Sequence, residues 1–322
     1  MDAISTDALT KNYSVGFWRP RPYLALESLT LQVGVGEVFG FLGPNGAGKT
    51  TTLKLLMQLI YPTSGRAEIL GRPVGDLEVK RRIGYLPENP YFYDYLSAEE
   101  LLEYFSALFG HAPAERRRRA SALLDEVGIA AERRLQLRKF SKGMLQRVGI
   151  AQALINEPEI VFLDEPMSGL DPLGRRDIRE LILRLRDRGC TVFFSSHVLS
   201  DAEALCSRVA ILANGRLVSQ GRLSEILAFK IRGWELVVSG VTDAALEHAR
   251  SSAGVLGATC LGPERYALEL PLTVSPEHLL ADLVATGAAL VSLNPLRDTL
   301  EDFFVRQVAA APGERGLEGA QG

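Results

Sequence analysis

The sequence predicts an α/β fold built around a mainly parallel sheet that helices cover. Three apolar stretches indicate buried strands, at residues 37–42, 160–163 and 191–195. Helical patterns lie between them, and strands that alternate with helices favour a parallel sheet with both faces covered. Of the 322 residues, 47% are hydrophobic and 23% are charged, so the chain can bury a substantial core.

Two further regions surround this predicted sheet. Residues 4–38 predict an antiparallel β lobe, because residues 29–33 alternate apolar and polar side chains. Residues 18–22 (Trp-Arg-Pro-Arg-Pro) predict an extended loop, since proline cannot donate to a strand ladder. Residues from about 90 to 150 predict a helical insertion. We therefore expect a first domain over residues 1–228.

The pattern changes after residue 228. Short alternating strands and two helices predict a small accessory α/β domain over residues 229–308, with residues 296–304 as its last helix. Residues 309–322 are rich in Ala, Gly and Glu and predict a disordered tail, because they cannot bury enough apolar surface. The chain is thus expected to have two folded parts and a tail.

Composition and charge exclude several classes of protein. With 36 basic and 39 acidic residues the net charge is −3, which gives no indication of nucleic acid as a partner. No uninterrupted apolar run reaches about 18 residues, so the chain is not expected to span a membrane. The N-terminus lacks a basic and then apolar secretory signal. We therefore expect a cytoplasmic location.

A phosphate-binding motif follows the first predicted strand. Residues 43–50 read Gly-Pro-Asn-Gly-Ala-Gly-Lys-Thr and match the P-loop spacing between a strand and a helix. Backbone N–H groups of such a loop surround phosphate oxygens, Lys49 bridges the β- and γ-phosphates, and Thr50 offers a hydroxyl to Mg²⁺. ATP and Mg²⁺ are therefore the expected cofactors. The candidate nucleotide ligands here are Gly43, Asn45, Gly46, Ala47, Gly48, Lys49, Thr50 and Thr51.

Two carboxylates end the second apolar strand. Asp164 and Glu165 follow residues 160–163, at the carboxyl edge where parallel sheets place their ligands. Asp164 is the candidate for holding Mg²⁺ through water. Glu165 is the candidate catalytic base, because phosphoryl transfer to water needs a group that accepts a proton or orients the water. The strand and its carboxylates form the pattern of a Walker B motif.

Further motifs in order along the chain point to one family. Residues 140–147 read Phe-Ser-Lys-Gly-Met-Leu-Gln-Arg, residues 168–171 read Ser-Gly-Leu-Asp, and an isolated His197 follows a buried strand. Together with the P-loop and Asp164-Glu165, these residues resemble the nucleotide-binding subunit of ABC transporters over about residues 4–225. The resemblance implies a P-loop NTPase core and ATP hydrolysis.

The resemblance also implies roles for single residues. Ser141 and Gly143 would close on the γ-phosphate held by an opposite subunit, so that two ATP molecules lie in a head-to-tail dimer of this chain with itself or a paralogue. His197 would be the switch histidine at the γ-phosphate, and Asp171 a further nucleotide-site residue. The sequence departs from the family pattern at Lys142 and Met144.

Two other positions carry a role by resemblance. Tyr13 resembles the aromatic residue that stacks on adenine, with Phe17 and Trp18 as competitors for that role. Glu88 stands where the family usually has a glutamine that reaches Mg²⁺ and the attacking water. A carboxylate can also bind Mg²⁺.

The expected partner is a separately encoded, multi-span membrane permease of exporter type. It would hold this chain at the cytoplasmic face of the membrane. The aromatic residues of 91–95 (Tyr-Phe-Tyr-Asp-Tyr) are either packed on the helical insertion or a groove for a partner helix. The alternative function is a soluble ABC-type ATPase acting on ribosomes or DNA. The single P-loop and the short interval between Thr50 and Ser141 count against it.

Overall fold

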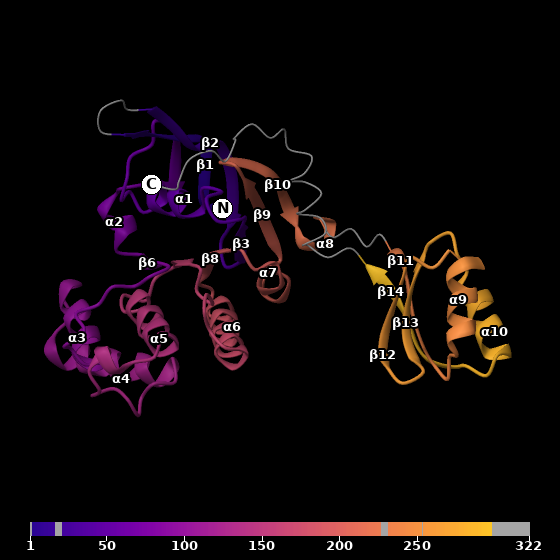
Figure 1. The fold of residues 1–322 in the computed structure, drawn as a ribbon. Coiled ribbons are helices and arrows are strands. Elements are labelled where there is room, and N and C mark those ends of the chain that lie inside the picture. The colour runs from indigo at the N-terminus through magenta and orange to yellow at the C-terminus, as the bar shows by residue number, and fades with distance from the viewer. Residues whose placement is uncertain (1, 17–20, 227–230, 253, 298–322) are drawn as a thin grey trace. The chain divides into compact units, whose positions relative to one another are not determined.

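The computed structural model describes residues 2–16, 21–226, 231–252 and 254–297. The chain divides into two compact units, Met1–Leu223 and Ser224–Gly322 (Figure 1), and each unit has a hydrophobic core of its own. The division falls slightly before residue 228, the boundary expected from the sequence. The expected tail at 309–322 lies outside the described residues.

The first unit is organised by a six-stranded sheet in the order β10-β9-β3-β8-β7-β6. The neighbours β3, β6, β7, β8 and β9 run parallel, and β10 is an antiparallel edge strand. This confirms the predicted parallel sheet. The strands are β3 (Val38–Leu42), β6 (Ile83–Leu86), β7 (Ile160–Asp164), β8 (Thr191–Ser196), β9 (Arg208–Ala213) and β10 (Arg216–Arg222).

The predicted antiparallel lobe is a second sheet in the order β2-β1-β4-β5. Its strands are β1 (Asp2–Val15), β2 (Arg21–Gly34), β4 (Ser64–Ile69) and β5 (Arg72–Pro73). The prediction of a loop was wrong for Arg21 and Pro22, which begin β2. Pro22 lies opposite Ser14, and it is tolerated because β2 is an edge strand.

Helices cover the parallel sheet and form the helical insertion. Ser97 caps α3 through a reciprocal bond with Glu100, which explains why this helix begins there. No helix in the described part of the chain is long and apolar enough to cross a membrane. The helices are α1 (Lys49–Leu56), α2 (Leu77–Lys80), α3 (Ala98–Leu108), α4 (Pro113–Glu126), the 3-10 helix η1 (Leu137–Lys139), α5 (Lys142–Ala153), α6 (Pro172–Asp187), α7 (Leu199–Leu205) and α8 (Leu223–Ile226).

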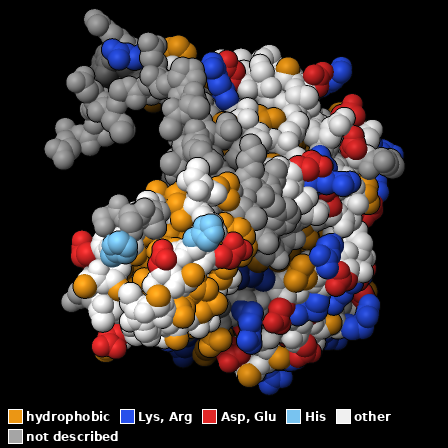
Figure 2. All heavy atoms as spheres, turned by 90° about the vertical axis from the view of Figure 1, so that its right-hand side faces the viewer, with side chains coloured by type: hydrophobic (Ala, Val, Ile, Leu, Met, Phe, Trp, Pro, Cys, Tyr) orange, Lys and Arg blue, Asp and Glu red, His pale blue; other side chains and the backbone are white. Residues whose placement is uncertain are grey.

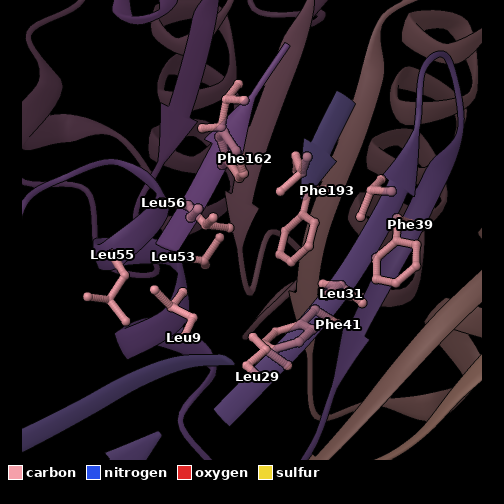
Figure 3. Packing of buried hydrophobic residues seen from close by; sticks show 14 of the residues in the cluster. Leu9, Leu29, Leu31, Phe39, Phe41, Leu53, Leu55, Leu56, Phe162 and Phe193 are labelled. Atoms are coloured by element: carbon pink, nitrogen blue, oxygen red, sulfur yellow. The ribbon is translucent and has the colours of Figure 1, made fainter. Parts of the chain in front are cut away.

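The core of the first unit lies between the two sheets and around α1 (Figure 3). Four phenylalanines from three neighbouring strands meet there. The ring of Phe193 lies 5.7 Å from that of Phe39, 5.3 Å from Phe41 and 5.7 Å from Phe162, between ring centroids. Such pairs add to the free energy gained by burial. Because α1 contributes leucines to the same cluster, its first turn is fixed at the end of β3.

The second unit has the element order β-α-β-β-α-β. Its sheet order is β12-β13-β11-β14 with antiparallel neighbours throughout, the arrangement of a ferredoxin-like split βαβ fold. Leu236, Leu268 and Leu279 belong to its core. The predicted helix at 296–304 was wrong for Leu296 and Arg297, which end a strand, and its remainder lies outside the described residues. The elements are β11 (Ile231–Ser239), α9 (Asp243–Ser252), β12 (Gly257–Gly262), β13 (Arg265–Pro271), α10 (Pro276–Ala285) and β14 (Ala289–Arg297).

The second unit exposes both aliphatic and charged side chains. Figure 2 faces this unit and shows hydrophobic side chains beside acidic and histidine ones. Large aliphatic side chains that are exposed include Leu256, Leu261, Leu272, Val284, Leu290 and Val291.

Candidate functional site

Two positions of the P-loop leave no room for a side chain. Gly48 has φ +107°, and a Cβ atom there would lie 2.6 Å from the carbonyl oxygen of Ala25. At Gly43 a Cβ atom would lie 2.4 Å from the carbonyl oxygen of Leu212. Both contacts are too close for a side chain, so the loop holds its backbone tightly against β2 and β9. Its amides and the N-terminus of α1 therefore face one small space.

Lys49 is buried and held at the mouth of this loop. Its Nζ donates to the carbonyl oxygens of Gly43 at 2.7 Å and Pro44 at 3.3 Å, and lies 3.2 Å from Glu165 Oε1. Only 6% of Lys49 is exposed. The ammonium is therefore a fixed positive charge between the phosphate loop and the end of β7.

A cavity of about 260 Å³ opens beside the P-loop. Of the residues predicted from sequence to bind the nucleotide, it brings together part of the loop with Glu88 from the segment after β6 and Glu165 from the end of β7. Gly43 and Ala47 belong to the loop but do not line this space. The lining residues are Tyr23, Ala25, Pro44, Asn45, Gly46, Gly48, Lys49, Thr50, Thr51, Glu88 and Glu165.

Asp164 is a buried carboxylate beside the first turn of α1. Only 1% of it is exposed; Thr50 Oγ1 donates to its Oδ2 at 3.0 Å, and Ser195 Oγ donates to its Oδ1 at 2.5 Å. Burial raises the pKa of Asp164, and the two hydroxyl bonds and the charge of Lys49 offset this only in part. A cation placed here would stabilise the ionised carboxylate. Ser195 was missed from the sequence, although it is a polar residue at the end of an apolar strand.

Asp164 and Thr50 fit a magnesium ion better than a transition metal. Among the described residues there is no group of three or more His, Cys, Asp or Glu side chains placed to hold a metal. The oxygen atoms of Thr50 and Asp164 are instead 3.0 Å apart. Magnesium needs few protein ligands, because water and substrate phosphates complete its shell.

Glu165 and His197 come together from the ends of adjacent strands. His197 Nδ1 lies 2.9 Å from Glu165 Oε2, within hydrogen-bond distance, while Glu165 Oε1 accepts no hydrogen bond among the described residues. Glu165 also has φ +50°, a left-handed backbone that is strained for a residue with a side chain. Its N–H is held by the backbone and hydroxyl oxygens of Ser195, at 3.2 and 3.1 Å. The surrounding structure thus keeps this carboxylate in place.

Tyr23, an aromatic residue that no sequence motif indicated, lines the cavity. Tyr13, the predicted adenine contact, does not line the cavity; Lys11 Nζ lies 5.2 Å from the centre of its ring. Tyr13 and Tyr23 are directly opposite each other in the β1–β2 pair, so both side chains leave the same face of the sheet. Sequence periodicity alone does not give the register of this hairpin. The register is what would identify Tyr23 as a neighbour of Tyr13.

The P-loop cavity is not lined by Ser141, Gly143 or Asp171 of the same chain. Ser141 caps α5 by accepting from the N–H of Met144, and Asp171 caps α6 by accepting from the N–H of Gly174. These caps explain where both helices begin. Contacts of these three residues with a nucleotide therefore remain predictions that require a second subunit.

Known proteins share both the sequence and the fold. The ABC transporter family model matches residues 26–168. An uncharacterized ABC transporter ATP-binding protein of Synechocystis sp. is 46% identical over 322 residues, covering 99% of this chain and 87% of the relative. The linearmycin resistance ATP-binding protein of Bacillus subtilis is 32% identical over 292 residues, covering 87% of this chain and 92% of the relative.

A solved structure is similar to this chain in fold. It is the dimeric structure of an ATP-binding cassette in a post-hydrolysis state bound to ADP and Pi, similar with a TM-score of 0.63 and 27% identity over 68% of this chain and 98% of that chain. The chain therefore belongs to the ATP-binding subunits of ABC transporters.

Proposed function

We propose that this chain hydrolyses ATP as one half of a dimer, with Glu165 as general base and His197 as the residue that holds Glu165 and the γ-phosphate. One observation carries the proposal. Lys49, Glu165 and His197 form a continuous chain of contacts at the mouth of the P-loop, at 3.2 and 2.9 Å. It joins a phosphate-binding cation to a carboxylate and then to a histidine.

The contacts suggest how the site works. Phosphate oxygens compete with Glu165 for Lys49, so that nucleotide binding releases Glu165 from its ion pair. The freed carboxylate, still held by His197, can accept a proton from a water aimed at the γ-phosphate. Mg²⁺ held by Thr50, by Asp164 through water and by Glu88 would neutralise charge on the phosphates.

A second subunit completes this proposed site. Ser141 and Gly143 of the same chain do not line the cavity, and a head-to-tail dimer would bring the partner's signature segment to the phosphate. The dimeric cassette to which this chain is similar supports that arrangement. The dimer would contain two copies of this chain or this chain and a paralogue.

The decisive variant is Glu165→Gln. Glutamine keeps the shape and can still meet His197 but cannot accept a proton from water. We expect steady-state ATP hydrolysis to fall by about a hundredfold or more, while ATP binding persists and an ATP-loaded dimer accumulates in size-exclusion chromatography. Glu159→Gln is a matched control, because Glu159 lies just before the opposite end of β7, and in the described part of the chain its side chain pairs with surface Arg82. Parent-like turnover in Glu165→Gln would disprove the assignment.

We further propose that the dimer drives a separately encoded, multi-span export permease at the cytoplasmic face of the membrane. A groove of about 370 Å³ between the helical insertion and the sheet is lined by Leu59, Tyr85, Phe109 and neighbours. Beside it on the chain, Tyr91 and Tyr93 are exposed, whereas Phe92 is half-buried. Apolar and tyrosine-rich surfaces suit a partner helix. The relative named for linearmycin resistance supports export.

Capture from membranes tests this partner. Tagged Glu165→Gln protein, loaded with ATP, would be recovered from detergent-solubilised membranes and its companions identified by mass spectrometry. We expect a multi-span membrane protein, and a loss of that protein when Tyr85 and Phe109 are replaced by Ala. Recovery of ribosomal or DNA-bound proteins alone would overturn the permease proposal.

A further inference from the structure

An ion-pair cluster around one buried carboxylate joins α6 and α7. Asp201 on α7 is only 1% exposed, and its carboxylate meets two arginines of α6. Arg179 Nη2 donates to Asp201 Oδ1 at 2.5 Å, and Arg175 Nη1 lies 3.8 Å from Oδ2. None of these three residues lines the P-loop cavity. The cluster therefore acts on the reaction only through other residues.

One side of the cluster is tied to the loop that carries His197. Asp201 is four residues after His197, and its N–H donates to the carbonyl oxygen of Val198 at 3.3 Å. The N–H of Val198 in turn donates to Ser196 Oγ at 2.9 Å. These two hydrogen bonds connect the residues on either side of His197 to one another and to Asp201. A shift of Asp201 is therefore expected to move His197.

The other side is tied to the segment after β7. Arg175 Nε donates to the carbonyl oxygen of Leu170 at 3.4 Å, so this one guanidinium spans Leu170 and Asp201. The same segment is joined to Glu165, because the N–H of Ser168 donates to the Glu165 carbonyl oxygen at 3.1 Å. The loops after β7 and β8 thus meet through Glu165 and His197, and the helices that follow them, α6 and α7, meet where Arg175 and Arg179 contact Asp201.

We infer that Asp201 is a positioning residue that sets His197 against the segment 168–171, with Arg175 as its link. A movement of residues 168–171 then shifts α7 and His197 with it. The inference rests on the role proposed for His197. A buried ion pair is a costly way to stabilise a core, since apolar residues of similar size often do as well. The fixed geometry of the ion pair would instead hold the two loops at a constant position relative to each other.

The test uses the purified full-length chain and five variants. Asp201→Asn and Arg175→Gln each remove one end of the link. Arg176→Gln is the matched control, because Arg176 is the next residue on α6, is largely exposed and, among the described residues, pairs with Glu180 at 3.6 Å. His197→Ala measures the role on which the inference rests. Rates would be expressed per nucleotide-binding site, so that a loss of folded protein does not count as a loss of activity.

We expect Asp201→Asn and Arg175→Gln to lower kcat by about tenfold to a hundredfold, as misplacement of a catalytic group does. KM for ATP and the affinity for a fluorescent ATP analogue should stay near those of the parent, since the cavity is untouched. Asp201→Glu, which keeps the charge, should recover part of kcat. Arg176→Gln should match the parent.

Two outcomes would overturn the inference. One is a kcat within about twofold of the parent in both Asp201→Asn and Arg175→Gln. The other is a pair of results: Asp201→Asn does not fold, and Arg175→Gln has the kcat of the parent. Arg175→Gln is informative in that case because the Arg175 side chain is 30% exposed and can be lost without unfolding. A parent-like His197→Ala would instead refute the proposed function.

Discussion

The two units of this chain use opposite kinds of sheet. In the first unit β3, β7 and β8 are parallel neighbours, so the residues that follow them, including Lys49, Glu165 and His197, meet at one edge. In the second unit every pair of neighbouring strands is antiparallel, so successive strand ends fall on opposite edges. Parallel topology gathers chemistry at one place, and the antiparallel unit lacks that means of doing so.

The burial of polar groups shows the same contrast. Among the described residues, every buried charged side chain belongs to the first unit, namely Lys49, Asp164, Glu165 and Asp201. The core of the second unit is apolar, and its surface exposes further aliphatic side chains. A buried charge is costly unless it is paired, so it is expected mainly where it has a functional role. Among the described residues, the buried charges therefore lie in the unit that holds the P-loop.

The largest expected effect tests whether the two cores are independent. Leu236→Ala should destabilise the second unit by about 2–5 kcal/mol, the range for such a cavity, and leave ATP hydrolysis by the first unit unchanged. Phe193→Ala should destabilise the first unit by about 3–5 kcal/mol. Urea unfolding followed by Trp234 fluorescence, in a Trp18→Phe background, reports the second unit, while ATP hydrolysis reports the first.

The contrast would fail if Leu236→Ala lowered ATP hydrolysis at urea concentrations where the parent is fully active. Leu236→Met is the control, because it nearly conserves volume and should shift the Trp234 transition only slightly. Coincident shifts of both probes would show that the two units unfold together.

Much of the site could be predicted from the sequence because its motifs are local. The P-loop spacing and the carboxylates at the end of a strand identify Lys49, Thr50, Asp164 and Glu165, since each pattern lies within a few residues. The parallel sheet follows from apolar strands separated by helices. In the second unit, β12 has a weak sequence pattern, because it is an edge strand of small and exposed residues with little alternation.

What could not be predicted depends on pairing between distant residues. Tyr23 reaches the cavity because of the hairpin register, and Ser195 reaches Asp164 because the two residues are aligned across β7 and β8. The contact of Arg175 with Asp201 joins two helices whose packing angle no local pattern encodes. Long-range geometry, and not residue type, supplied these parts of the site.

The next effect concerns Tyr23, the aromatic residue that lines the P-loop cavity. Tyr23→Ala should raise KM for ATP by roughly fivefold or more, because stacking of a base on an aromatic ring is worth about 1–3 kcal/mol. kcat should change little, since the phosphate groups are untouched. Tyr13→Ala should change KM less, because Tyr13 does not line the cavity. Steady-state ATPase kinetics of both variants measure the difference.

The reverse order, a larger KM change in Tyr13→Ala, would show that Tyr13 carries the adenine as the sequence predicts. Tyr23→Phe is the matched control, because it keeps the ring and removes only the hydroxyl. It should bind ATP like the parent if stacking is the cause.

The smallest expected effect concerns stability. Burial of Asp164 lowers the free energy of unfolding of the first unit. Because burial raises the pKa of Asp164, the folded chain holds its proton more tightly than the unfolded chain. The stability of the parent therefore falls as pH rises from the ordinary carboxylate pKa through the raised one, and stays reduced above it. Asp164→Asn lacks this loss and can keep the bond from Ser195.

We therefore expect Asp164→Asn to raise the Tm of the first unit at pH 8 by roughly 2–4 °C, as about 1 kcal/mol would, and to abolish ATP hydrolysis. At acid pH the difference from the parent should shrink, because Asp164 is then neutral too. The Trp234 transition of the second unit should not move and serves as the internal reference. A variant less stable than the parent at pH 8 would show that Lys49, Thr50 and Ser195 fully compensate the buried charge. In that case the site would carry no stability cost for its chemistry, and the contrast between the two units would rest on topology alone.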